Sequence, residues 1–250
     1  MSAGEIALIV FGLTFGGAVV GTSIRGRLPE QHLSSDSRDV VKLAVGTVAT
    51  LSALVLGLLI ATAKSSFDTK NAEVVRLATN IILLDRQLVH YGPEAQGARE
   101  LLRLFTSYKI DVIWKAHAPP SAVEANDWAF LGDLHDRIRG LTPEGPAQQI
   151  IQSRALQLAG EIAAGRSLLE LQTESSIPVP FLWILLFWLA IIFTSFGLLT
   201  SPNATVLAVL LVCALSVSSA IFLILEMDIP FQGLIQVSSA PMREVLAHLR

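Results

Sequence analysis

Three runs without a charged residue constrain this chain more than any other feature of its sequence. They cover residues 6–24, 43–63 and 175–225. An apolar helix of about 20 residues crosses a bilayer core of about 30 Å, so each of the first two runs predicts one membrane-spanning helix. The third run is long enough for two helices, and a turn sequence at residues 200–203 divides it into 179–199 and 205–225. The sequence therefore predicts four transmembrane helices in contact with membrane lipid.

A segment of different composition lies between the second and third spans. Residues 64–174 hold 12 of the 18 basic and 14 of the 21 acidic residues of the chain. Its apolar residues recur three and four apart, which is typical of one face of a helix, as at Val74, Leu77, Ile81, Leu84 and Leu88. No alternating strand pattern occurs in the sequence. We therefore expect an all-α integral membrane protein, with a helical soluble domain inserted between the second and third spans.

The segments that flank the spans complete the expected organisation. Residues 25–42 are expected to form a loop, and residues 226–250 a tail at the membrane interface. Four residues directly after the fourth span are interpreted as an interfacial motif with a helix-ending proline: Glu226, Asp228, Pro230 and Phe231.

Composition and motif content exclude several classes of function. The net charge of −3 provides no basic surplus for nucleic acid. No two of the five histidines lie three or four residues apart, so no metal site is expected. No nucleophile motif or glycine-rich phosphate loop occurs. We expect no catalytic residues, no cofactor and no enzymatic activity.

Glycines recur at four-residue spacing in the first span. Gly12 pairs with Gly16, and Gly17 pairs with Gly21. Small residues at this spacing let two helix backbones approach closely in lipid. The pattern predicts close packing, either against another span of the same chain or against a second subunit.

The second span has a stripe of small and mildly polar residues: Thr47, Thr50, Leu54, Gly57 and Ala61. Such a stripe could line a narrow pore, in which threonine hydroxyls replace part of the hydration of an ion and Leu54 forms a dewetting constriction. It could equally form a tight seam between helices, where glycine and threonine are common. No charged residue lies inside any span, which argues against a proton relay.

Basic residues near the spans give a nearly balanced orientation signal. Four of them lie on the side of residues 25–42 and five on the side of the insert and the C-terminus. Around the first span alone, Glu5 before the helix and Arg25 and Arg27 after it favour an outside N-terminus.

Three stretches of the sequence are distinctive: RLPEQHLSSDSRDVVKLAVGTVATLSALVLGLLIATAKSSFD, LDRQLVHYGPEA, and FQGLIQVSSAP following LEMDIP. They resemble the bacterial bestrophin-like domain proteins, a membrane family whose domain has no known function. The chain is similar more distantly to true bestrophins, which are pentameric anion channels with four spans and a cytosolic helical portion. That likeness rests on the span count, the insert and the Pro230-Phe231 pair.

The resemblance implies a location and a function. It implies a bacterial inner-membrane protein with a cytoplasmic insert and cytoplasmic termini, and a second span that lines a pore. The acidic run that binds calcium in animal bestrophins is absent, and Gln232 precedes Gly233, so no calcium switch is carried over.

We therefore interpret the chain as a homo-oligomeric ion channel, anion-conducting by analogy and with chloride as the candidate ion. The alternative is a non-conducting membrane scaffold or sensor whose helical insert binds a partner protein.

Overall fold

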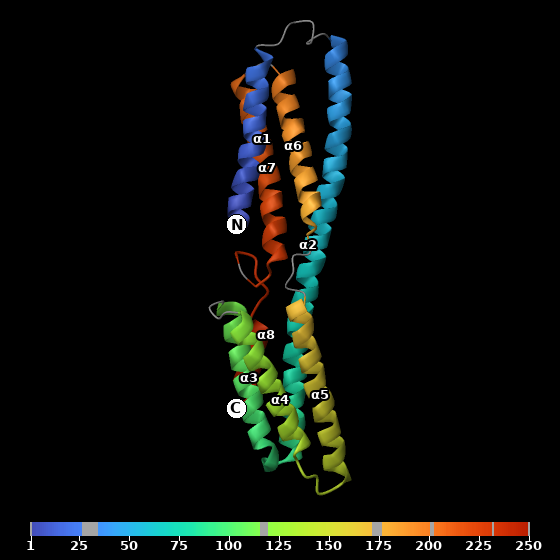
Figure 1. Ribbon diagram of the computed structural model, residues 1–250, viewed down its shortest axis with the longest axis vertical. Coiled ribbons are helices and arrows are strands. Elements are labelled where there is room, and N and C mark those ends of the chain that lie inside the picture. The colour runs from blue at the N-terminus through green and yellow to red at the C-terminus, as the bar shows by residue number, and fades with distance from the viewer. Residues whose placement is uncertain are drawn as a thin grey trace. The chain divides into compact units, whose positions relative to one another are not determined.

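The computed structural model describes residues 2–26, 35–115, 120–171, 177–200, 203–231 and 233–249. These ranges contain eight α-helices and one short 3-10 helix, and no strand. The all-α prediction is confirmed. The chain divides into two compact units, one of residues 1–66 and 175–228 and the other of residues 67–174 and 229–250. We call them the span unit and the insert unit, and helix α2 contributes to both (Figure 1).

The span unit holds α1 (Ala3–Arg25), the first part of α2 (Ser35–Tyr91), α6 (Val179–Leu199) and α7 (Ala204–Asp228). All four helices are long and apolar enough to cross a membrane, which agrees with the four predicted spans. Helix α1 begins before its charge-free run, because Ser2 and Glu5 form a reciprocal capping box at its first turn.

Helix α1 packs closely against both α6 and α7 in the span unit (Figure 1). A Cβ atom built at Gly21 would overlap the carbonyl oxygen of Thr194 on α6. One built at Gly197 would overlap the carbonyl oxygen of Ala18. On the α7 side, the Ser218 hydroxyl donates to the Ala7 carbonyl oxygen at 2.5 Å. Glycine on both helices therefore permits a backbone-to-backbone approach between α1 and α6.

Helix α2 is a single helix of 57 residues. It starts at Ser35, so residues 35–42, which the sequence analysis assigned to a loop, are helical. The charged residues before the apolar run of residues 43–63 are compatible with a helix. Lys42 pairs with Asp39 at 3.2 Å on the helix surface. No glycine or proline occurs from residue 58 to residue 91, which lets the helix continue into the insert unit. It ends at Tyr91, and the next residue, Gly92, has a φ of 129° that suits glycine.

The insert unit packs the second part of α2 with η2 (Pro93–Ala95), α3 (Gln96–Lys115), α4 (Pro120–Arg139), α5 (Pro146–Leu171) and α8 (Ala240–His248). Helix α4 contacts α3 on one side and α5 on the other. The apolar α2 positions predicted from the sequence are buried in the core of this unit: Val74, Leu77, Ile81, Leu84 and Leu88. Polar contacts at the ends of the helices complete the unit, since the Gln152 amide donates to the carbonyl oxygens of Ile138 and Leu141.

The C-terminal segment departs from the expected interfacial tail. Helix α7 continues to Asp228, and Val237, Met242, Val245 and Leu249 are buried in the core of the insert unit. Helix α8 packs against α3. The three- and four-residue spacing of its apolar positions gives it a face that is buried against its own chain.

Candidate functional site

In the described part of the chain, no other segment covers the predicted stripe of α2. Thr47, Thr50, Leu54, Gly57 and Ala61 are all exposed, and Leu54 is 72% exposed. A Cβ atom built at Gly57 would meet no other atom within 4 Å. The stripe is therefore not a seam against another helix within one described subunit.

The opposite side of α2 contacts the core of the span unit. Ser52, Leu59 and Ala63 are buried there, with exposed fractions of 5% or less. Leu59 and Ala63 belong to the same apolar cluster as residues of α1, α6 and α7. Packing of this side fixes the rotation of the helix and so leaves the stripe on its free surface.

The threonine hydroxyls of the stripe donate hydrogen bonds to backbone carbonyl oxygens of their own helix. Thr47 donates to the Leu43 carbonyl oxygen at 3.1 Å, and Thr50 donates to the Gly46 carbonyl oxygen at 2.9 Å. Each hydroxyl then presents oxygen lone pairs, and no proton, to the outside. The stripe is polar but has no charge, and in this geometry it offers no hydroxyl donor to an anion.

The four glycines of α1 divide into two pairs. Gly17 and Gly21 face α6, where a Cβ atom at Gly17 would lie 2.9 Å from the Thr194 hydroxyl oxygen. Gly12 and Gly16 have no atom within 4 Å of a built Cβ. The first pair thus serves packing within the chain, and the second pair lies on a surface that the described chain leaves open.

The four residues of the predicted interfacial motif lie in two parts of the structure: two at the end of α7 and two in the segment after it. Glu226 and Asp228 are buried at the end of α7, and both have interaction partners. Pro230 is buried, and its carbonyl oxygen accepts the Val237 N–H at 2.7 Å. Phe231 packs in the insert unit. Pro230 and Phe231 therefore contribute to the packing of the C-terminal segment in the insert unit.

The family of the chain follows from comparison with known proteins. The model of the bestrophin-like domain matches residues 12–242, which is most of the chain. The chain belongs to the bestrophin-like domain family. Among solved structures, this bestrophin-like chain is similar to a point mutant of a bacterial bestrophin homolog from Klebsiella pneumoniae. The two share 16% sequence identity over 97% of each chain, with a TM-score of 0.58. No curated protein sequence matches.

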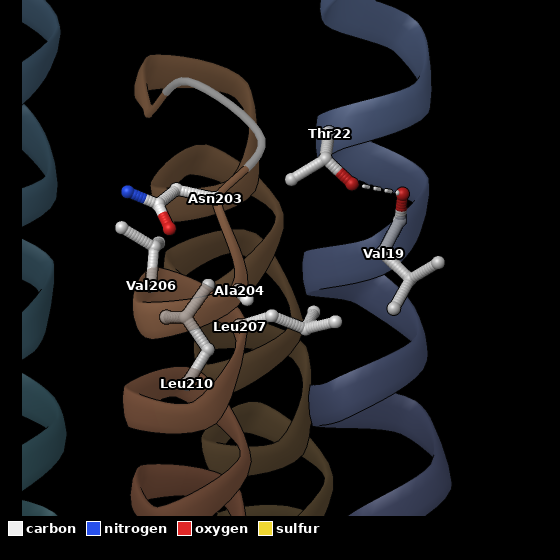
Figure 2. A pocket seen from close by; sticks show the side chains of 7 residues that line it. All are labelled: Val19, Thr22, Asn203, Ala204, Val206, Leu207 and Leu210. Atoms are coloured by element: carbon white, nitrogen blue, oxygen red, sulfur yellow. Dashed lines mark hydrogen bonds between the residues drawn. The ribbon is translucent and has the colours of Figure 1, made fainter.

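The bestrophin-like chain also has a pocket that the sequence did not indicate. It has a volume of about 270 Å³ and lies between the end of α1 and the start of α7 (Figure 2). Seven residues line it: Val19, Thr22, Asn203, Ala204, Val206, Leu207 and Leu210. The Thr22 hydroxyl donates to the Val19 carbonyl oxygen at 2.7 Å. The lining is mostly apolar and has no ionisable group, so it provides no acid, base or nucleophile for catalysis.

Two features of the chain were not predicted from the sequence. Gly197 is the α6 partner of the α1 glycines, and a glycine within an apolar span was the signal that could have indicated it. Trp114 contacts the segment after the fourth span, and no local pattern in the sequence pairs residues so far apart. Among the described residues, no group of three His, Cys, Asp or Glu side chains is arranged to hold a metal ion.

Proposed function

We propose that this bestrophin-like protein is a homo-oligomeric ion channel in which α2 of each subunit faces the central axis. The observation that carries the proposal is the exposed stripe of small residues and threonines on a helix whose other side is packed. A polar, uncharged stripe of this kind suits a pore that replaces part of the hydration of an ion.

An oligomer supplies what one subunit lacks. The described part of a single chain leaves the stripe open, together with Gly12 and Gly16 on α1. Symmetric assembly of identical subunits would place several stripes around one axis and give the two glycines a neighbour for close packing. Leu54 would then form an apolar ring, and narrow apolar rings close pores by excluding water.

The resemblance to bestrophins supports anion conduction and an orientation. We propose chloride as the conducted ion, with the insert unit and both termini in the cytoplasm of a bacterial cell. The local charge signal around the first span favours the opposite orientation, so the proposal depends on the family likeness.

The test is chloride flux in liposomes that contain the purified chain. We expect the wild type to dissipate a chloride gradient and Gly57→Leu to reduce the flux, because a leucine side chain within the stripe would narrow the pore that the stripe lines. Ala208→Leu on α7 is a matched control, since Ala208 is also small and exposed in the span unit. Background flux for an intact wild-type oligomer would favour the alternative function, a scaffold or sensor that binds a partner through the insert.

A further inference from the structure

In the insert unit, α2 has one buried face and one face that the described chain leaves open. The buried face provides the apolar core positions from Val74 to Leu88. The open face is formed by exposed residues at helical spacing: Ala72, Val75, Arg76, Thr79, Leu83, Arg86 and His90. These residues include two arginines and no acidic residue.

The acidic residues of this stretch are turned away from the open face. Asp85 is only 14% exposed and pairs with Arg99 of α3, at 2.8 Å from its Nε atom. Glu73 is 18% exposed and lies 3.9 Å from the Arg76 guanidinium. Arg76 is therefore partly compensated. Arg86 makes no ion pair in the part of the chain that the structure describes.

Charge of both signs occurs closer to the span. Lys64 and Asp68 are exposed on α2, and each has an interaction partner. Between residues 43 and 63 there is no charge, and the hydroxyl protons of Thr47 and Thr50 are already donated to carbonyl oxygens. The transmembrane stripe therefore has nothing that would prefer an anion to a cation.

We propose that Arg86 on the open face of α2 selects anions for the channel, and that the transmembrane stripe does not. This inference rests on the proposed function, because only an assembly with α2 around its axis repeats Arg86 as a ring. A ring of like charges at a pore attracts ions of the opposite sign and repels the others. Each subunit would contribute one guanidinium to this ring, and so one positive charge.

The experiment measures the reversal potential of the purified full-length channel in bilayers under a potassium chloride gradient. We expect Arg86→Glu to lower the chloride-to-potassium permeability ratio about tenfold, because the charge of every subunit is reversed. Arg86→Gln should lower the ratio less, because it only removes the charge. The difference between wild type and Arg86→Gln should shrink at high salt, where screening shortens the range of the charge.

Arg154→Glu is the matched control. Arg154 lies on α5, is also exposed, and bonds to Gln157 with no carboxylate partner among the described residues, so reversal of its charge should leave the permeability ratio unchanged. An equal ratio for wild type, Arg86→Glu and Arg154→Glu in conducting channels would overturn the inference and leave the channel function intact. Absence of conduction in wild type would instead contradict the channel function itself. Loss of the oligomer in both Arg86 variants, detected by mass, would also overturn the inference, because it would place this face at a subunit interface.

Discussion

The indole of Trp114 on α3 meets the ring of Phe231 edge-on, with ring centroids 6.0 Å apart and planes at 88°. The same indole donates its N–H to the Val237 carbonyl oxygen at 2.8 Å. Edge-to-face pairs of this kind contribute about 0.5–1.5 kcal/mol beyond their buried area. The Trp114 side chain therefore contacts the segment after the fourth span at two residues, Phe231 and Val237.

Replacing Trp114 with phenylalanine should weaken this connection. The variant keeps an aromatic ring but leaves the Val237 carbonyl oxygen without its donor, which costs about 1 kcal/mol. Thermal unfolding of the full chain in detergent measures the loss. Trp183→Phe on α6 is the control, because Trp183 is 67% exposed and should lose little. Equal melting temperatures for the two variants would show that the Trp114 hydrogen bond does not stabilise the fold.

The sequence predicted the spans and the insert because hydropathy and helical spacing are local properties. The apolar residues from Val74 to Leu88 are buried as predicted, and four helices are apolar enough to cross a membrane. The packing of the C-terminal segment was not predictable, since it depends on a contact such as Trp114 to Val237, across 123 positions of the chain. The stripe on α2 was found by spacing, but its exposure depends on how the opposite face packs.

The two glycine pairs of α1 should respond differently to substitution. Gly21→Ala places a Cβ atom against the Thr194 carbonyl oxygen, a backbone atom that cannot rotate away. Overpacking of this kind costs about 1–3 kcal/mol. Gly12→Ala meets no atom within 4 Å and should not destabilise an isolated subunit, since alanine favours a helix over glycine by about 0.5–1 kcal/mol. Unfolding curves in detergent measure both variants, and a Gly21→Ala melting temperature equal to that of wild type would contradict the close α1–α6 contact.

A larger substitution at Gly12 tests whether this face of α1 lies at a subunit interface. If Gly12 and Gly16 pack against a second subunit, Gly12→Leu should lower the oligomer mass without the loss of stability expected for Gly21→Ala. Native mass measurement before and after cross-linking in membranes gives the subunit count. An unchanged oligomer would remove this face of α1 from the subunit interface.

Alkaline pH should destabilise the insert unit through Tyr91. Burial, followed by the carboxylates of Glu94 and Glu144, raises the pKa of Tyr91 above its ordinary value of 10.0. The unfolded chain therefore loses this proton at a lower pH than the folded chain. The stabilising contribution is complete below pH 10 and falls as the pH rises through the folded pKa.

Tyr91→Phe isolates this effect. The hydroxyl is buried without a hydrogen-bond partner among the described residues, so its removal should cost little near neutral pH. Above about pH 10, the variant should lose less stability than the wild type. Melting temperatures measured from about pH 7 to about pH 11 provide the comparison, and parallel curves would exclude a contribution from Tyr91.

The orientation of the chain can be read from cysteine accessibility. Cys213 is exposed on α7, so the background variant is Cys213→Ser. With a cytoplasmic insert, Gln96→Cys should resist a membrane-impermeant thiol reagent in spheroplasts, whereas Asp36→Cys should react. The reverse pattern would place the insert outside and would agree with the local charge signal around the first span.

Leu54→Ala distinguishes a pore from a seam between subunits. Because Leu54 is 72% exposed within the described chain, its truncation should cost a single subunit little stability. At a pore constriction, the smaller side chain should widen and wet the passage and raise chloride flux, with little change in melting temperature. At a buried seam between subunits, the same change should cost about 2–5 kcal/mol and leave the flux at background. Flux in liposomes and unfolding of the same oligomer preparation give both values, so a lowered melting temperature with background flux for wild type and variant would reject the pore.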